Sequence, residues 1–155
     1  LSVQLLGVGD AQLLVRLSEV DHLFEHDPAD HRPSPVATSD AAGFLADPAV
    51  RFWLATSGGE PVGMLHCVVI SLFEAGGGRE LLLYDLGTHV AHRRRGVARA
   101  LVDAMEQHVE SEGISEVWLG AARTAVEFYR ACGYGSSDEL FMAKELGSGA
   151  GQTFR

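Results

Sequence analysis

Hydrophobic and polar positions recur along the chain with two periods. Alternation with period two predicts strands, and recurrence every three or four residues predicts helices. The expected strands cover residues 2–8, 50–56, 61–73, 80–88, 115–120 and 140–146. The expected helices run from an Asp10 cap to Leu23, from Ser39 or Asp40 to Leu45, from Val97 to a stop at Gly113, and over 124–132. This order predicts an α/β (α+β) domain with an antiparallel meander.

Clusters of glycine, serine and proline mark the expected connections. Residues 57–60 and 76–78 predict two turns between strands, and the Asp-, Pro- and His-rich residues 26–39 predict an irregular connection. We expect one domain over residues 1–146 and a flexible Gly/Ser-rich tail over residues 147–155.

The composition is that of a globular protein with an excess of negative charge. The chain has 155 residues, of which 46% are hydrophobic and 21% charged, and its formal net charge is -9. A chain of this length suits one hydrophobic core. Its charge repels phosphate backbones and anionic lipid headgroups, so we expect no nucleic-acid or membrane partner and favour a cationic substrate.

Neither the start of the chain nor its longest apolar stretch has the features of a targeting or membrane-spanning segment. Residues 1–17 lack a basic leader, and residues 64–73 are too few to span a bilayer. Two cysteines, Cys67 and Cys132, cannot form a disulfide framework, which favours a reducing compartment. We therefore expect a soluble, cytoplasmic protein.

The most informative segment joins the expected strand at 80–88 to the helix that follows Gly96. Three consecutive arginines, Arg93 to Arg95, precede that glycine. The first N–H groups of a helix have no partner inside it, the helix dipole adds positive charge, and glycine permits close approach. Such an end binds phosphate. The alternative is a solvated basic turn without a ligand.

Two motifs, in order, resemble the signatures of the GNAT superfamily of N-acyltransferases. Arg93-x-x-Gly96-x-Ala98 resembles the acyl-CoA signature, and Ala125-x-x-Phe128-Tyr129-x-x-x-Gly133-Tyr134 resembles the second signature. The resemblance implies a mixed, mostly antiparallel sheet flanked by helices, in which splayed strands open a slot for acyl-CoA. It also implies acetyl-CoA as the acyl donor.

Within the superfamily, the runs Leu83-Tyr84-Asp85-Leu86 and Leu72-Phe73-Glu74 are most similar to the aminoglycoside 3-N-acetyltransferases. Two positions depart from the expected pattern. Ala122 stands where many members have an Asn that binds the pantetheine arm, and Arg123 stands where an acidic loop is expected. The resemblance implies transfer of an acetyl group to a primary amine. The alternatives are a protein or peptide N-acetyltransferase and a non-catalytic acyl-CoA-binding module.

The resemblance also implies where the donor binds. The pantetheine arm is expected beside the strand near residues 86–90, where a bulge that Gly87 could permit would separate two strands. The expected cofactor-binding residues are Leu86, Gly87, Thr88, Arg93, Arg94, Arg95, Gly96, Val97, Ala98 and Arg99.

Asp85 and Tyr129 are the candidate catalytic residues. Attack on a thioester needs a neutral amine, and a carboxylate such as Asp85 can take the proton. Asp85 lies inside an apolar run, where an ionised carboxylate is costly to bury without partners. The resemblance assigns Tyr129 as the acid that protonates the leaving thiolate. The alternatives are a carboxylate that binds backbone N–H groups and a tyrosine that packs a helix on the sheet.

The region between Leu17 and Val50 is expected to attract a small cationic amine. It holds seven acidic residues against one arginine, Arg32, and so carries a formal charge of -6. The candidate substrate-binding residues are Glu25, Asp27, Glu74 and Tyr84. The alternative is a solvated acidic face. A homodimer is one state that the sequence allows.

Metal binding and nucleophilic catalysis are not expected. His22 and His26 have the helical i,i+4 spacing of a ligand pair, but no third ligand follows at a diagnostic spacing. Neither cysteine has a basic neighbour in sequence that would lower its pKa.

Overall fold

The computed structural model describes residues 1–24, 35–138, 142 and 144. The chain forms two compact units, Leu1–Ala121 and Ala122–Arg155, which are described separately. The expected strand at 140–146 and the expected tail lie almost entirely outside the described residues, as do Glu25 and Asp27. The extent of a single domain over residues 1–146 stays a prediction.

The first unit contains a five-stranded sheet whose strands lie in chain order. The strands are β1 (Ser2–Leu5), β2 (Val50–Ser57), β3 (Glu60–Ser71), β4 (Arg79–Thr88) and β5 (Glu116–Leu119). The first four pair antiparallel, and β5 pairs parallel to β4. The prediction of a mixed, mostly antiparallel sheet flanked by helices is confirmed.

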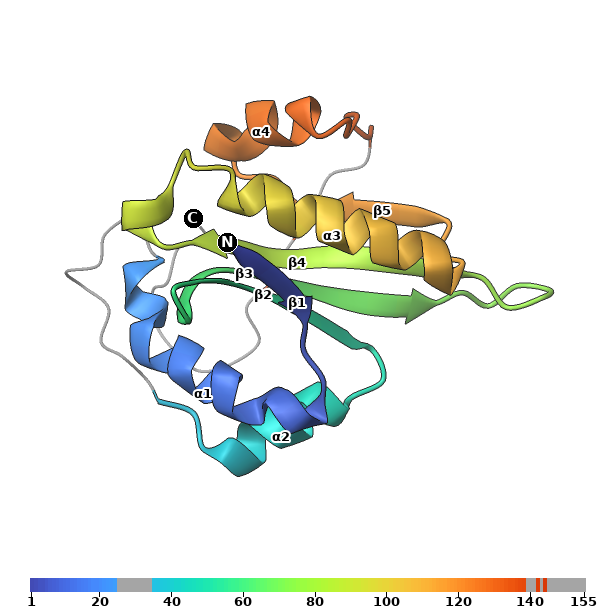
Figure 1. The fold of residues 1–155 in the computed structure, drawn as a ribbon. Coiled ribbons are helices and arrows are strands. Elements are labelled where there is room, and N and C mark those ends of the chain that lie inside the picture. The colour runs from blue at the N-terminus through green and yellow to red at the C-terminus, as the bar shows by residue number, and fades with distance from the viewer. Residues whose placement is uncertain (25–34, 139–141, 143, 145–155) are drawn as a thin grey trace. The chain divides into compact units, whose positions relative to one another are not determined.

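Three helices cover the two faces of this sheet, with α3 on one face and α1 and α2 on the other (Figure 1). They are α1 (Ala11–Val20), α2 (Thr38–Ala46) and α3 (Val97–Glu112). The 3-10 turns of this unit are η1 (Val8–Asp10), η2 (Asp21–Leu23) and η3 (Val90–His92).

Of the two predicted N-caps, Asp10 is the N-cap residue of α1, whereas Ser39 and Asp40 lie inside α2. Asp10 precedes α1 without a side-chain capping bond, because its Oδ2 accepts the Gly7 N–H at 2.9 Å in the turn before it. Helix α2 begins at Thr38, before the predicted Ser39 or Asp40, and its N-cap Ala37 makes no side-chain bond. Neither helix therefore begins with a side-chain capping bond.

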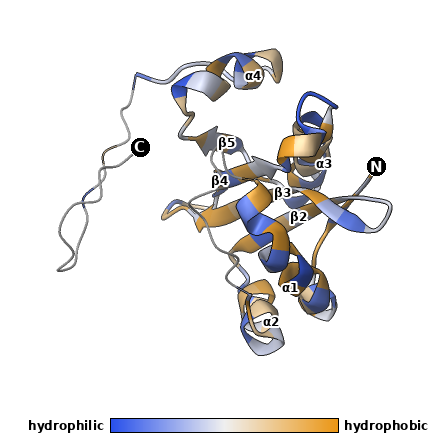
Figure 2. Ribbon diagram, turned by 90° about the vertical axis from the view of Figure 1, so that its left-hand side faces the viewer, coloured by the Kyte–Doolittle hydropathy of each residue, from blue (hydrophilic) through white to orange (hydrophobic). Residues whose placement is uncertain are grey.

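Each helical layer packs on the sheet through a hydrophobic set of its own. Between the sheet and α1 and α2, the buried cluster is Leu6, Leu17, Phe52 and Leu54. On the α3 face, Gly63 of β3 permits a close approach, because a Cβ there would lie 2.4 Å from Val97 Cγ1. Hydrophobic colour is concentrated on the strands, whereas the helices carry both classes of residue (Figure 2).

A one-residue shift interrupts the pairing of β3 with β4. Cys67 pairs with Leu83, but His66 pairs with Asp85, so Tyr84 is the extra residue of a β-bulge. Side chains that are directly opposite in a ladder lie on the same face of the sheet. Odd-numbered residues of β4 therefore share a face with odd-numbered residues of β3 before the bulge and with even-numbered ones after it. The shift places Asp85 on the α2 face.

The second unit contains the short helix α4 (Val126–Ala131), which follows the 3-10 turn η4 (Arg123–Ala125). The predicted helix at 124–132 thus forms partly as a 3-10 turn. Gly133 ends it with φ 95°, a conformation that favours glycine. No helix in the described part of the chain is long and apolar enough to span a membrane.

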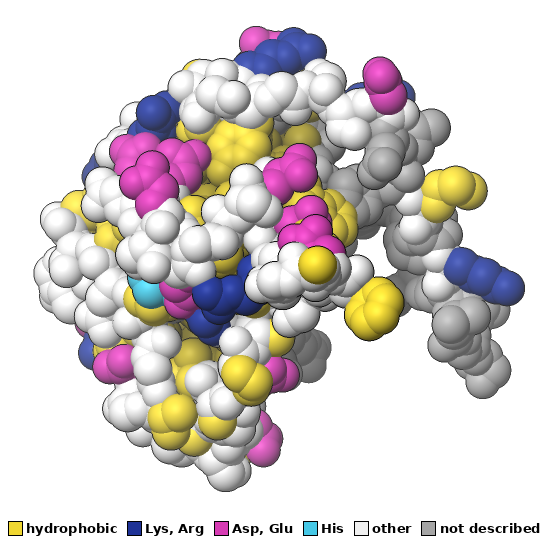
Figure 3. All heavy atoms as spheres, turned by 90° about the vertical axis from the view of Figure 1, so that its right-hand side faces the viewer, with side chains coloured by type: hydrophobic (Ala, Val, Ile, Leu, Met, Phe, Trp, Pro, Cys, Tyr) yellow, Lys and Arg dark blue, Asp and Glu magenta, His cyan; other side chains and the backbone are white. Residues whose placement is uncertain are grey.

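An ion-pair cluster holds the C-terminal end of α3 to the sheet. Both carboxylate oxygens of Glu112 accept from Arg51 of β2, at 3.0 and 3.1 Å. His108 Nε2 lies 2.9 Å from Glu112 Oε1, and Arg79 of β4 donates to the Glu112 carbonyl. Figure 3, which looks onto this end of the first unit, shows acidic, basic and histidine side chains in one group.

These partners set the charge state of Glu112. Burial by itself raises the pKa of Glu112, but the hydrogen bonds and positive charge of Arg51, with those of His108, outweigh it and hold the pKa below the ordinary 4.5. The stabilisation is therefore fully present above pH 4.5 and is lost as the pH falls through the lower pKa of the folded state.

Glu112→Gln is expected to lower the free energy of unfolding by about 1–2 kcal/mol at pH 7, because it removes a charged partner of Arg51. The difference from the wild type should shrink as the pH falls through the lowered pKa of Glu112 in the folded state, because the wild-type carboxylate then becomes protonated as well. Urea unfolding at several pH values measures both effects. The exposed neighbour Glu110→Gln is the control and should change stability by less than about 0.5 kcal/mol.

Candidate active site

The bulge in β4 presents Asp85 at the surface of the first unit. Asp85 and Tyr84 are exposed, and Tyr84 keeps 69% of its surface accessible. The apolar run around Asp85 suggested burial, and this interpretation is wrong because the register shift turns the carboxylate away from the α3 face. Gly87 does not form the bulge. Instead it packs under Phe24, whose Cδ1 would lie 3.0 Å from an added Cβ.

Strands β4 and β5 run together for only four residues. In the described part of the chain, their ladder extends from Glu80 and Glu116 to Leu83 and Leu119. Leu86, Gly87 and Thr88 lie beyond the end of that ladder, on the continuation of β4. An extended ligand arm can add to such an edge as a strand would. The ladder thus ends just before the residues where the slot is expected.

The arginine turn, residues Arg93–Gly96, leads from η3 into α3. Arg94, Arg95 and Gly96 are exposed, and a Cβ added at Gly96 would meet no atom within 4 Å. Gly96 has φ 82° and Arg94 has φ 59°, both in the left-handed region. The Ala100 N–H bonds to the Gly96 carbonyl at 2.9 Å, so the N–H groups of Val97, Ala98 and Arg99 precede this first helical bond.

The arginines of this region differ in what they contact. The Arg93 guanidinium donates to the Phe24 carbonyl at 2.8 Å and to the Thr88 carbonyl at 3.3 Å, so it ties η2 to the end of β4. Arg99 pairs with Asp103 at 2.8 Å on the exposed side of α3. Arg94 and Arg95 are thus the arginines best placed to bind an anion.

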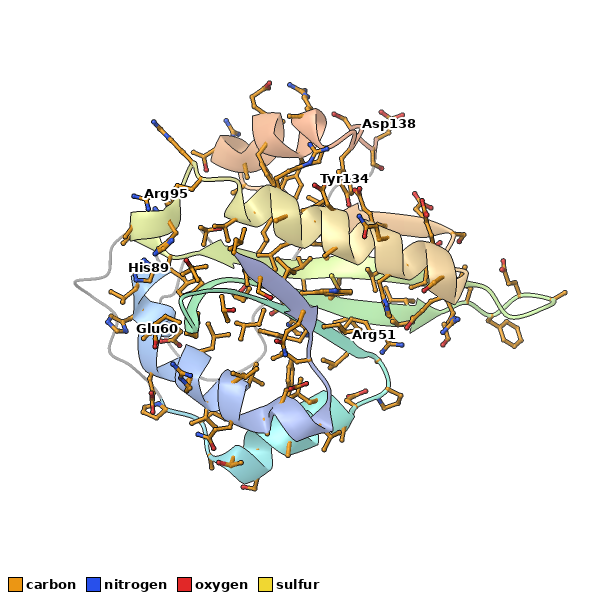
Figure 4. The ribbon with its side chains drawn as sticks, viewed as in Figure 1. Arg51, Glu60, His89, Arg95, Tyr134 and Asp138 are labelled. Atoms are coloured by element: carbon orange, nitrogen blue, oxygen red, sulfur yellow. The ribbon has the colours of Figure 1, made fainter. Side chains whose placement is uncertain are left out.

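Three histidines, His22, His89 and His92, lie near the arginine turn. Burial first, and then the charges of His92, Arg93 and His22, lower the pKa of His89. The His89 ring packs edge-on against Phe24, with centroids 6.0 Å apart. Figure 4 shows His89 and Arg95 at one end of the first unit and Arg51 at the other. Sequence reasoning did not find the cluster of His22, His89, His92 and Arg93, because its members come from two distant segments of the chain.

The predicted substrate-binding residues do not all meet. Tyr84 is next to Asp85 at the bulge, whereas Glu74 lies in the β3–β4 turn, where its carboxylate covers Gly78. About 20 Å of extended strand separates Arg79, which follows that turn, from Asp85. Glu74 therefore does not belong to the site at the bulge, and the prediction that it binds substrate there is wrong.

His66 is a residue of this site that sequence reasoning missed. It pairs with Asp85 across the β3–β4 ladder, and its ring lies 5.3 Å from that of Tyr84. A lone histidine inside an apolar run carries no signal of a site. Cys67, the next residue, is buried, and burial raises its pKa to about 12, so it stays a thiol.

In the second unit, Tyr129 lies on α4 and packs against the rings of Phe128 and Tyr134, with centroids 5.1 and 5.8 Å apart. Ala122 and Arg123 form the start of the turn before α4 and are exposed. Among the described residues, no group of three or more His, Cys, Asp or Glu could hold a metal ion.

A mixed sheet with a glycine turn at a helix N-terminus next to the end of a strand ladder is the arrangement expected of acyl-CoA-dependent transferases. The acetyltransferase (GNAT) family matches residues 16–134. The chain belongs to this family, and GNAT acetyltransferases use acetyl-CoA as the acyl donor. The exposed glycine, the exposed arginines and the open strand edge fit that donor.

Curated relatives are N-acetyltransferases. N-acetyltransferase 8 of Rattus norvegicus is 31% identical over 102 residues, which are 64% of this chain and 46% of that protein. N-acetyltransferase 8 of Homo sapiens is 30% identical over 104 residues, which are 63% of this chain and 44% of that protein. The chain thus spans less than half the length of these relatives.

Solved structures share the fold. An aminoglycoside acetyltransferase, meta-AAC0020, from an uncultured soil metagenomic sample in complex with sisomicin has a TM-score of 0.79 at 18% identity, covering 94% of this chain and 95% of its own. The ribosomal-protein-alanine N-acetyltransferase of Brucella melitensis biovar Abortus 2308 has a TM-score of 0.70 at 20% identity, covering 94% and 100%. At these identities the likeness shows the fold alone.

Gly96→Val is expected to weaken binding of CoA by about tenfold or more, because the side chain fills the open space above the helix N–H groups and at least one charge-assisted hydrogen bond is lost. Isothermal calorimetry on the folded variant measures this change. Wild-type affinity would contradict the assignment of the arginine turn.

Gly113→Val is the matched control. Gly113 has φ 67° and lies just beyond the C-terminal end of α3, with no atom within 4 Å of an added Cβ. The two variants therefore carry a similar backbone strain at opposite ends of one helix. CoA affinity should change only in Gly96→Val.

Proposed function

We propose that this protein transfers an acetyl group from acetyl-CoA directly to a primary amine of a small cationic substrate. The observation that carries the proposal is the β4 bulge, which exposes Asp85 on the α2 face, one strand position from the open edge at Leu86–Thr88. An exposed base beside the slot for a thioester is what acyl transfer to an amine requires.

Asp85 acts as the base in this proposal. Its carboxylate takes a proton from the substrate ammonium, which frees the nitrogen lone pair to bond to the acetyl carbon, or from the tetrahedral intermediate after that bond has formed. As the new C–N bond forms, the C–S bond of the thioester breaks. Because the acetyl group passes directly to nitrogen, no covalent enzyme intermediate is needed.

Tyr129 acts as the acid. A phenol has an ordinary pKa of about 10 and can donate its proton to the thiolate that leaves. The motif match of α4 supports this role. CoA then leaves as a thiol and not as a thiolate.

Backbone groups and arginines hold the donor. The N–H groups of Val97, Ala98 and Arg99 with the side chains of Arg94 and Arg95 bind its phosphates, and Leu86 to Thr88 pair with its pantetheine arm. Ala122 offers no amide side chain at the position of the family's Asn.

The charge of the protein supports a cationic acceptor. The net charge is -9, and Glu19, Asp21, Asp40 and Asp47 are the described acidic residues of the region between Leu17 and Val50. Exposed Tyr84 adds an aromatic face that attracts cations. Acetylation of an aminoglycoside at its 3-amino group is the most specific version, and Arg123 weighs against it because it adds a positive charge to the loop before α4.

A peptide or protein amine is the second candidate. The structural neighbour from Brucella melitensis is named as a ribosomal-protein-alanine N-acetyltransferase, and an acidic region would attract a basic peptide as well as a polyamine. The size and charge of the acceptor separate the two candidates.

Asp85→Asn is expected to lower kcat by about two to four orders of magnitude while CoA affinity is kept, because only the proton acceptor is removed. Tyr129→Phe should act in the same direction but more mildly. Thiol release from acetyl-CoA with an accepted amine measures both. Asp10→Asn is the control. It is the same substitution in the turn before α1, and it keeps a side-chain oxygen that can accept the Gly7 N–H. Near-normal single-turnover rates in Asp85→Asn would refute the assignment.

Acceptor screening tests the substrate class. The panel contains kanamycin-type sugars, spermidine, basic peptides and neutral amines, with mass spectrometry of each product. We expect the small polycations to be acetylated. Their apparent KM should rise with salt while kcat changes little, because exposed charges are screened over about 8 Å at physiological ionic strength. If only peptides or uncharged amines react, the cationic small-molecule proposal is wrong.

A further inference from the structure

His66 of β3 lies on the same face of the sheet as Asp85. The two residues are ladder partners immediately after the bulge, and side chains of directly opposite residues are close neighbours. The same face carries Phe44 of α2, whose ring contacts that of His66. His66 is therefore on the side of the sheet where Asp85 is exposed.

Three aromatic rings surround the His66 imidazole. The centroids of Phe44, Tyr84 and Phe52 lie 5.1, 5.3 and 5.9 Å from it. Its Nε2 is buried and has no hydrogen-bond partner in the part of the chain that the structure describes. A buried nitrogen without a partner costs about 1–3 kcal/mol, so native proteins retain one where a ligand or a solvent molecule completes it.

The ring environment suits an amine ligand. Burial lowers the pKa of His66, so the imidazole is neutral at pH 7 and offers one donor and one acceptor nitrogen. A neutral ring does not repel a cation, and the surrounding aromatic faces attract one. Tyr84 is 69% exposed, and an exposed side chain changes rotamer rapidly, which gives an amine access to the His66 ring.

We propose that His66 is an acceptor-binding residue, which hydrogen-bonds the amine substrate on the α2 face and holds it beside Asp85. This inference rests on the proposed function, acetyl transfer to an amine. It adds a residue from β3 to a site otherwise built on β4, and it assigns a ligand to the buried nitrogen. His66 positions the amine, whereas Asp85 takes the proton.

Two variants separate the nitrogen from the ring. His66→Phe keeps an aromatic ring against Phe44, Phe52 and Tyr84 but removes both nitrogens. His66→Gln removes the ring but keeps a donor and an acceptor. We expect His66→Phe to raise the KM of an accepted amine by about tenfold, with a smaller change in kcat, and His66→Gln to recover most of the loss.

The control is the same substitution on the other face of the sheet. His108 of α3 contacts Trp53 and Glu112 and faces neither Asp85 nor the arginine turn. His108→Phe should lower the melting temperature and leave the amine KM unchanged. Calorimetry with CoA should give the same affinity for all three variants, because none of them touches the donor site.

The outcomes are distinguishable. Wild-type KM and kcat in His66→Phe would overturn the inference while the proposed function stands. Equal losses in His66→Phe and His66→Gln, in step with a fall in melting temperature, would assign a packing role and also overturn it. If the wild type acetylates no amine of the panel, the proposed function fails, and the ring nitrogen NMR signals of His66 decide the inference separately. Amine-dependent shifts in the CoA-bound protein support it, and their absence overturns it.

Discussion

The one-residue shift between β3 and β4 is the constraint on which the arrangement of the site depends. Before it, Leu83 shares the α3 face with Cys67, and after it Asp85 shares the opposite face with His66. Continued alternation would have placed Asp85 with Leu81 and Leu83 under α3, where an ionised carboxylate is costly. The extra residue, Tyr84, therefore makes an exposed acid compatible with a buried apolar strand.

Helix α3 links the stability of the first unit to its proposed chemistry. Gly63 lets the helix approach β3 closely, and Glu112 holds its C-terminal end to Arg51 and Arg79. Its other end begins after Gly96, where the first N–H groups of the helix follow a left-handed residue. One helix thus carries the ion-pair cluster at one end and the proposed donor site at the other.

Several polar side chains have contacts that the motifs do not show. Arg93 belongs to the motif, but its guanidinium binds the carbonyls of Thr88 and Phe24 and so positions the strand end instead of facing outward. His66 and His89 belong to no motif, although each packs edge-on against a phenylalanine ring and has a lowered pKa. Contacts between segments far apart in sequence give these residues their roles.

The sequence by itself determined the periods of its strands and helices, and the two motifs that place it in a family of acetyltransferases. Local spacing encodes both, because the hydrophobic period follows from backbone geometry and the motifs are short. Only the tertiary structure decided the face on which Asp85 lies, the separation of Glu74 from the bulge, and the position of His66 opposite Asp85. The register between β3 and β4 sets the first and the third, and the length of β4 sets the second; the apolar run at the centre of β4 has no strict alternation that would fix this register in advance.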